Sequence, residues 1–244
     1  MRRMLTFANR TMKEILRDPL TIAFGLGFPL IILLLLSLIQ ANIPVPMFEL
    51  QHLTPGITVF GLSFMTLFSA QLISHDRESA FLTRLYTTPL KAHEFILGYL
   101  LPILPLCIVQ NIICYIAALV LGLSFSINII WAILMNLVPS LFFIALGLLC
   151  GSAMNEKQVG GICGALLTNL SAWLSGIWFD ISMLGKAIGS FANALPFIHA
   201  VELERAVLVG NFSSALPHLL WVAAYAVVIL VVAVFMFLKQ MKKQ

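Results

Sequence analysis

The feature of this sequence that most limits its fold is a series of six long apolar stretches, each without Asp, Glu, Lys or Arg. A helix needs roughly 20 apolar residues to cross the hydrocarbon core of a bilayer, and all six stretches reach that length. They are Pro19–Ile39, Pro55–Ser74, Phe95–Leu121, Ile129–Gly151, Val159–Phe179 and Ala215–Leu238. We therefore predict an all-α membrane protein with six transmembrane helices.

The composition agrees with a chain whose solvent is lipid. Hydrophobic residues make up 61% of the 244 residues and charged residues only 10%, whereas a soluble domain carries about 25% charged residues. Because the apolar stretches run evenly from end to end, we predict one membrane domain. The net charge of +4 does not indicate nucleic-acid binding, because the basic residues flank the apolar stretches and form no continuous patch.

The positions of the basic residues predict the orientation of the chain. Segments that connect membrane helices carry an excess of Lys and Arg on the cytoplasmic side. Of the 14 Lys and Arg residues, all but Lys186 and Arg205 lie before the first stretch, in the loop 75–94, at Lys157 or in the C-terminal tail. In a six-helix topology these segments share one side. Both termini are therefore expected in the cytoplasm, and residues 19–244 are expected to form the transmembrane domain.

Residues 1–18 form a second kind of element. At 100° per residue, apolar side chains gather on one face of a helix and basic ones on the other. The apolar face comprises Met1, Met4, Leu5, Ala8, Met12, Ile15 and Leu16, and the polar face comprises Arg2, Arg3, Asn9, Arg10, Lys13 and Arg17. This pattern predicts an amphipathic helix in the membrane interface, with its cations toward anionic lipid headgroups. A simple cluster of charges that orients the first membrane helix is the alternative.

The loop 75–94 is more apolar than a plain connector. It carries an apolar stripe with two arginines beside it: Phe81, Leu82, Leu85, Arg77 and Arg84. Thr88 followed by Pro89 is a good helix start, since a hydroxyl can cap a helix and proline fits its first position. We predict a short cytoplasmic helix here. Its stripe would either dock another protein or pack on the membrane domain.

The segment 180–214 lies on the opposite side and is too long for a structureless loop, which seldom exceeds about 15 residues. Pro196 near the start of an apolar run and Gly210 just past its end frame a short helix. Aromatic residues that mark a membrane interface precede it: Trp173, Trp178 and Phe179. We predict one or two short helices on the outer face, which would form a lid over the space between the membrane helices.

Motifs for catalysis or metal binding are absent from the sequence. There is no HExxH, GxSxG or GxxxxGK(S/T) pattern, and the nearest approach to the last, Gly185-Lys186-Ala187, has Asp180 where a glycine is needed. The cysteines lie inside apolar stretches without metal-ligand spacing: Cys107, Cys114, Cys150 and Cys163. Apart from His218, no ionisable residue lies within a stretch, which argues against an ion-coupled carrier. The chain is therefore predicted not to be an enzyme.

Three short motifs occur in order along the chain. They are Leu16-Arg17-Asp18-Pro19 after the interfacial helix, the run from Asp76 to Pro89 followed by Gly98, and Asn193-Ala194-Leu195-Pro196 through Arg205. Together with the six-helix topology, they resemble the membrane subunit of a type-2 ABC exporter. The resemblance covers nearly the whole chain.

The resemblance implies a division of labour in the bacterial cytoplasmic membrane. Two permease subunits, this chain with a second copy or a sister permease, would pair, and two separate ABC ATPase subunits would bind ATP and Mg²⁺ and dock below them. The implied coupling residues are Asp76, Arg77, Glu78, Phe81, Leu82, Arg84, Leu85, Thr88 and Pro89. The N-terminal helix would form a second contact through Arg10, Lys13, Arg17 and Asp18. Arg77 and Glu78 would pair with each other or with the ATPase.

A substrate path is the remaining hypothesis. Phe60, Phe64 and Phe68 are spaced by four, so they share one helix face; the stripe is typical of helix packing or lipid contact, and a path for a hydrophobic substrate is the sharper reading. With the resemblance, these residues together with Asn169 and Trp173 become candidates for a central path, which suits a large or amphipathic substrate. A membrane anchor or sensor that docks a cytoplasmic protein and a neutral-solute channel are the alternative functions.

Overall fold

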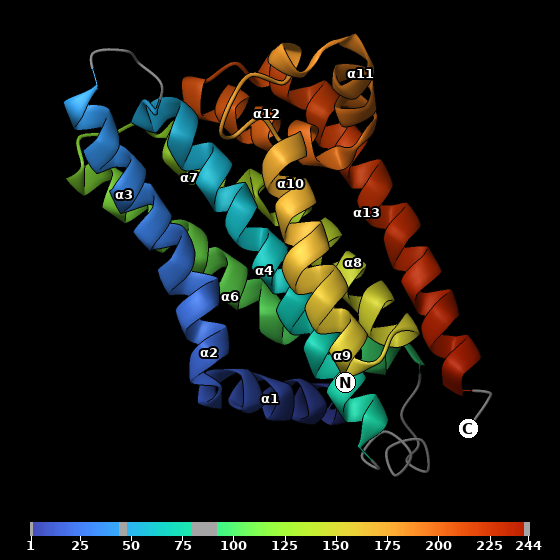
Figure 1. The fold of residues 1–244 in the computed structure, drawn as a ribbon. Coiled ribbons are helices and arrows are strands. Elements are labelled where there is room, and N and C mark those ends of the chain that lie inside the picture. The colour runs from blue at the N-terminus through green and yellow to red at the C-terminus, as the bar shows by residue number, and fades with distance from the viewer. Residues whose placement is uncertain (1, 44–47, 80–91, 242–244) are drawn as a thin grey trace.

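The computed structural model describes residues 2–43, 48–79 and 92–241. Within these ranges the chain is helical and contains no strand, so the predicted all-α fold is confirmed. Most helices run along one direction, and α1 (Arg2–Arg17) lies across one end of this bundle (Figure 1). We call this end the α1 end, and the opposite end, where α12 (Pro196–Val209) lies, the α12 end.

Five helical segments are long and apolar enough to cross a membrane: Pro19–Asn42, Leu50–Glu78, Glu94–Val120, Asn128–Ala153 and Phe212–Lys239. They are built from α2 (Pro19–Ile22), the π-helix η1 (Ala23–Gly27), α3 (Phe28–Asn42), α4 (Leu50–Glu78), α6 (Ala92–Val120), α7 (Asn128–Met135), α8 (Leu137–Ala153) and α13 (Phe212–Met241). Each corresponds to one of the predicted stretches.

The remaining predicted stretch, Val159–Phe179, differs from the prediction. The chain forms three consecutive helical pieces there: α9 (Glu156–Val159), the π-helix η2 (Gly160–Leu167) and α10 (Thr168–Leu174). The helix ends at Leu174, because Gly176 takes a left-handed φ of 69° that a continuing helix cannot accommodate. The described helices that are long and apolar enough to cross a membrane therefore number five, where the sequence predicted six.

Helix α4 forms the centre of the bundle. In its most apolar part 83% of the residues are buried, against 11–50% in the other four spans. Helix α8 approaches it closely through two glycines four positions apart: a Cβ on Gly147 would collide with Ser69, and one on Gly151 would lie 2.5 Å from the Ala70 carbonyl oxygen. Small residues at this spacing let two membrane helices pack at short range, so α4 and α8 form a closely packed pair.

Helix α1 has three kinds of surface, one buried, one apolar and exposed, and one basic, whereas the sequence predicted only an apolar and a polar face. Phe7, Ala8, Thr11 and Ile15 are buried, and α1 packs mainly on α6. Leu5 and Leu16, expected on the same apolar face, remain 55% and 58% exposed at the edge of the bundle. The basic side chains Lys13 and Arg17 are exposed. A helix at a lipid–water interface beside a bundle needs all three surfaces, since it meets protein, lipid and water at once.

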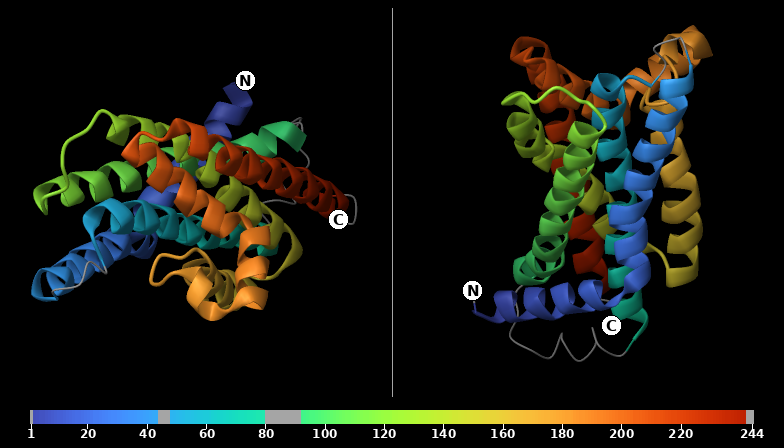
Figure 2. Two further views of the ribbon diagram at one scale, coloured as in Figure 1. Left: turned by 90° about the horizontal axis from the view of Figure 1, so that it is seen from above. Right: turned by 90° about the vertical axis from the view of Figure 1, so that its left-hand side faces the viewer.

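The α12 end includes the segment 180–214, which is helical as predicted but has three helical elements where one or two were expected. It contains the 3₁₀-helix η3 (Ile181–Leu184), α11 (Lys186–Ala194) and α12. As predicted, Pro196 begins α12, and Gly210 ends it with a left-handed φ of 85°. Figure 2 shows these helices at the end of the bundle away from α1.

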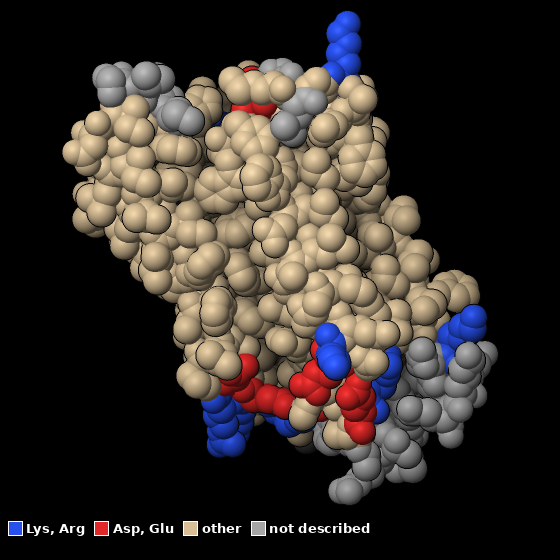
Figure 3. All heavy atoms as spheres, viewed as in Figure 1, with Lys and Arg blue, Asp and Glu red and all other residues tan. Residues whose placement is uncertain are grey.

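Charged side chains divide the two ends of the molecule. In the view of Figure 3 they gather at the α1 end, while the middle of this face carries neither acidic nor basic residues. Helix α1 and the last turns of α13 lie at that same end (Figure 1). This agrees with the prediction that the two termini share one side of the membrane.

Candidate functional site

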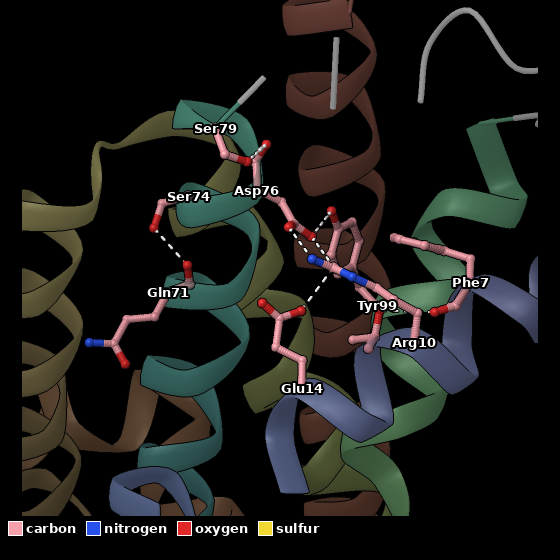
Figure 4. A network of polar contacts seen from close by, with 9 residues as sticks. Phe7, Arg10, Glu14, Gln71, Ser74, Asp76, Ser79 and Tyr99 are labelled. Carbon is pink, nitrogen blue, oxygen red and sulfur yellow. Dashed lines mark hydrogen bonds and ion pairs between the residues drawn. The ribbon is translucent and has the colours of Figure 1, made fainter. Parts of the chain in front are cut away.

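The carboxylate of Asp76 is the centre of a polar network at the α1 end (Figure 4). Arg10 on α1 donates to both of its oxygens, from Nη1 to Oδ2 at 2.7 Å and from Nη2 to Oδ1 at 2.9 Å. The Tyr99 hydroxyl on α6 donates to Oδ2 at 2.9 Å. Asp76 is 1% exposed, so the network joins α1, α4 and α6 through one buried group.

Elementary electrostatics explains why Asp76 needs these partners. It lies in the last turns of α4, where the unpaired carbonyls of the helix end disfavour a negative charge. Burial opposes the charge on Arg10, but its bonds to Asp76 outweigh this and raise the pKa of the guanidinium. Glu14, one turn along α1, binds the same Arg10 at 2.9 Å, and burial raises the pKa of Glu14. The cation is therefore shared between two helices.

Aromatic packing holds α1 in the same place. The Phe7 ring meets the Tyr99 ring edge-to-face at 5.0 Å between centroids, and meets Phe95 at 5.9 Å. It lies directly over Gly98, where any added Cβ would collide with the ring. Gly98, which belongs to one of the sequence motifs, thus lets Phe7 of α1 pack closely on α6.

The next two residues of α4 bind neighbouring helix ends. Arg77 donates to the carbonyl oxygens of Gly151, at 3.0 Å, and Ser152, both in the last turn of α8. Glu78 accepts a 2.8 Å bond from the backbone N–H of Glu156, the first residue of α9. A cation at a helix C-terminus and an anion at a helix N-terminus both complement the helix dipole. The sequence hypothesis was that Arg77 and Glu78 pair with each other or with the ATPase. Among the described residues, the two side chains bind α8 and α9 and not each other.

The other predicted coupling residues lie outside the described residues: Phe81, Leu82, Arg84, Leu85, Thr88 and Pro89. Asp76, Arg77 and Glu78 belong to the end of α4 and not to a separate helix. Asp18 caps α2, accepting from the Leu20 N–H at 3.0 Å and from the Thr21 hydroxyl at 2.6 Å. It therefore fixes the turn from α1 into the first span.

The phenylalanine stripe of α4 is buried, with Phe60, Phe64 and Phe68 each less than 10% exposed. Phe28 of α3 packs on Phe64 at 5.2 Å, and Trp178 packs on Phe60 at 5.9 Å. This contact runs from the first span to the turn after α10.

The two path candidates on α10 have a different environment. Asn169 is exposed and donates to the carbonyl oxygen of Ala165 in its own helical run, at 2.7 Å. Trp173 is 56% exposed and packs on Phe179 at 5.6 Å. The tryptophan that meets the phenylalanine stripe is thus Trp178, while Asn169 and Trp173 lie on an open face of α10.

Comparison with known families gives this geometry its context. A family model described as ABC-2 type transporter matches residues 2–209. The chain belongs to the ABC-2 type transporter family. The matched range includes α1, the Asp76 network and α12. No curated protein matches the chain closely enough to count as a relative.

Membership in the ABC-2 family makes the chain the multi-pass membrane domain of a transporter, a domain without an ATPase of its own. The resemblance stated from the sequence is thereby confirmed. In this setting, the Asp76 network is the candidate functional site, because it joins α1, which lies across the end of the bundle, to two candidate spans.

A second set of bonds holds the α12 end of this ABC-2 domain. Arg205 on α12 donates to the carbonyl oxygens of His52, at 3.3 Å, and Gly176, at 3.0 Å, and pairs with Glu202 at 2.8 Å. We call this arrangement the Arg205 latch. It borders a cavity of about 500 Å³ whose lining includes Trp178. The latch ties α12 to the first turn of α4 and to the turn after α10.

Three residues of interest have little signal in the sequence. Tyr99 is one of many aromatic residues in an apolar stretch, and Glu14 lies in a helix whose polar face is mostly basic. Glu204 belongs to the segment 180–214 between two apolar stretches, yet it is fully buried. A helical wheel of residues 196–209 would have found it, because Glu204 falls on the same face as Phe197 and Ala200.

Proposed function

We propose that this chain is the permease subunit of an ATP-driven exporter, coupled to separate ATPase subunits that bind ATP and Mg²⁺. The observation that carries the proposal is the bidentate pair between Arg10 and Asp76. It fastens α1, the proposed interfacial helix, to the buried end of the central span. A force on α1 is therefore transmitted to α4 and, through Tyr99, to α6.

Helix α4 is the proposed transmission element. Its α1 end binds α1, α6, α8 and α9 through consecutive residues, and its α12 end is held by the Arg205 latch. Its close packing on α8 supports movement of the two helices as a unit. Such a rigid element can switch between two arrangements if nucleotide binding by the partner favours one of them.

The proposed topology has six spans, with both termini in the cytoplasm. The span added to the five described above is the helical run from Glu156 to Leu174, which is fifth in chain order and is interrupted by the π-helix η2. At roughly 1.5 Å per residue its length is close to the roughly 30 Å of the hydrocarbon core. The α1 end then faces the bacterial cytoplasm, in agreement with the basic residues gathered there. Residues 1–18 lie in the interface, with Leu5 and Leu16 in lipid.

The proposed translocation path runs between two permease subunits, which are two copies of this chain or this chain and a sister permease. Asn169 and Trp173 are open on α10, so the second subunit can cover them. The buried phenylalanine stripe of Phe60, Phe64 and Phe68 packs beneath the surface that would line the path. Aromatic and amide groups without charge suit a large or amphipathic substrate.

The first experiment is gentle purification of the tagged chain from its native membrane, followed by identification of the proteins that accompany it. The proposal expects a stoichiometric ABC ATPase. A chain free of ATPase across several mild detergents would contradict the coupling and favour an anchor or sensor. Proteoliposomes without ATPase test the channel alternative, because a neutral-solute channel leaks under those conditions and an exporter subunit does not.

A further inference from the structure

Glu204 is a buried acid that the proposed coupling does not use. It is 0% exposed, on the face of α12 that packs into the bundle against α4, α7 and α13. Among the described residues, neither of its carboxylate oxygens has a hydrogen-bond partner. An ionised carboxylate in such a place loses its hydration and has no cation to replace it, so the charged form is strongly disfavoured.

Tyr115 of α6 faces the Glu204 carboxyl. Its side chain is 1% exposed, and its hydroxyl also has no partner of ordinary hydrogen-bond geometry among the described residues. A phenol hydroxyl at neutral pH carries no charge, so it cannot neutralise a carboxylate as an arginine would. The pair is thus an acid and an alcohol enclosed together, without a cation.

The other ionisable groups on α12 and the elements around it are engaged or exposed elsewhere. Arg205, the next residue, is occupied by the latch with Glu202 and two carbonyl oxygens. On α13, His218 binds His199 at 2.7 Å. The described residues of α7 and α10 include no ionisable side chain. At the α12 end, α4 contributes the exposed His52, α11 the exposed Lys186 and α6 the buried thiol of Cys114 beside Tyr115, while Tyr225 of α13 donates to the Ala194 carbonyl oxygen. The other ionisable residues of α4 lie at its α1 end.

We propose that Glu204 is a proton-binding site, and that a proton on its carboxyl keeps α12 seated in the bundle. The neutral acid can remain buried beside Tyr115 at small cost. Loss of the proton leaves a bare charge that is stabilised only when α12 lifts and water reaches it. The ligand of this site is a proton, and the moving part is the helix that carries the Arg205 latch.

The direction of the pH dependence follows from the two environments. Burial raises the pKa of Glu204 well above 4.5, and Tyr115 opposes this only in part. With α12 lifted, the hydrated carboxyl has its ordinary pKa. The equilibrium between seated and lifted α12 therefore favours the seated state most strongly below the ordinary pKa of the carboxyl. It shifts toward the lifted state as the pH rises from the ordinary pKa to the raised pKa of the seated state. Above the raised pKa it no longer changes with pH. One proton permits a change of up to about tenfold per pH unit.

A pair of cysteine reporters on α12 tests the proposal in the full chain, reconstituted in vesicles without ATPase. Val207→Cys places a thiol on the buried face, where Val207 is 1% exposed, and Val209→Cys places one at a position 70% exposed. A membrane-impermeant maleimide is added to the side where α12 lies. The ratio of the two labelling rates corrects for the pH dependence that the two thiols share, and the chain with only its four buried cysteines provides the background.

The expected result is a ratio that rises severalfold with pH in the wild type and stays low and flat in Glu204→Gln, which mimics the neutral acid. Glu49→Gln, an exposed glutamate at the start of α4, is the matched control and keeps the wild-type response. Equal pH responses in wild type and Glu204→Gln would overturn the proposal, as would a flat ratio in the wild type. Because no ATPase is present, either result is independent of the coupling proposed above.

Infrared spectroscopy of the wild-type protein supplies a second measurement that needs no reporter. A protonated carboxylic acid has a carbonyl stretch above the amide bands. The difference spectrum between wild type and Glu204→Gln at neutral pH is expected to contain this band. A difference spectrum with a carboxylate band in its place would show that Glu204 is ionised while seated, and would refute the proposal.

Discussion

Arg10 and Asp76 lie 66 positions apart in the chain, yet the guanidinium of the first binds both carboxylate oxygens of the second, at 2.7 and 2.9 Å. Tyr99 completes the contact from a third helix. Because the bond is bidentate, it fixes the orientation of α1 as well as its distance from α4. The position of the interfacial helix and the position of the central span are thus linked.

Replacing Asp76 by Asn is expected to loosen α1 without preventing membrane insertion. The loss of a charged hydrogen-bond partner costs about 1.5–3 kcal/mol, and the lower value applies here because Arg10 is 36% exposed. Hydrogen exchange should become faster throughout α1, while α8 stays protected. Glu49→Gln, remote from the network, is the control. Unchanged exchange in α1 would mean that aromatic packing alone holds it.

Gly98→Ala tests the aromatic half of the same contact. The new methyl group collides with the Phe7 ring, and overpacking of this kind costs about 1–3 kcal/mol. We expect a lower midpoint of thermal unfolding in detergent, restored in part by adding Phe7→Leu. Gly27→Ala is a matched control, because a Cβ there meets no atom within 4 Å. Equal destabilisation by the two alanines would contradict the contact.

Glu78→Ala is expected to reduce transport-coupled ATPase activity in the complex by roughly fivefold or more, the lower range of an allosteric coupling. Glu78 binds the backbone N–H that begins α9, so its loss separates the end of α4 from α9. Expression and insertion should remain normal. Lys157→Ala, which changes a neighbouring exposed charge, is the control. Normal coupling at normal expression would argue against this role.

Arg205→Lys keeps the charge of the latch but removes the fork that reaches two carbonyl oxygens. We expect faster hydrogen exchange in residues 176–181 and in the first turn of α4, with no change at the α1 end. Lys186→Gln, an exposed residue of neighbouring α11, should leave exchange in both segments as in the wild type. If exchange in both segments is also unchanged in Arg205→Lys, the latch does not hold these segments together.

The sequence predicted those features of the fold that depend on one helix at a time. Apolar length alone predicted five spans that the structure describes as long enough to cross a membrane, and Pro196 and Gly210 predicted the bounds of α12. The predicted stretch Val159–Phe179 extends beyond the helix, which ends at Leu174 because Gly176 adopts a left-handed conformation. The apolar residues around Gly176 gave no sign of this turn in the sequence.

The candidate site depended on contacts between segments far apart in the chain. Asp76, Arg77 and Glu78 were singled out by a motif, but their partners on α1, α6, α8 and α9 were not. Gly160 and Gly164 have the same spacing as Gly147 and Gly151. Added Cβ atoms on Gly147 and Gly151 would collide with α4, whereas one on Gly164 would make ordinary contact with Leu67 at 3.4 Å and one on Gly160 would meet no atom within 4 Å. A spacing of four places two glycines on one face but does not say which helix faces them.

By itself the sequence determined the solvent of this protein, its helices and the side on which its charges gather, because lipid imposes length and hydrophobicity on each span separately. Only the tertiary structure decided which face of α1 is buried, which groups bind Asp76, and that Glu204 is enclosed without a cation. Whether a polar side chain is buried depends on the residues around it. In this protein those residues belong to helices that are far apart in the sequence and come together only in the folded chain.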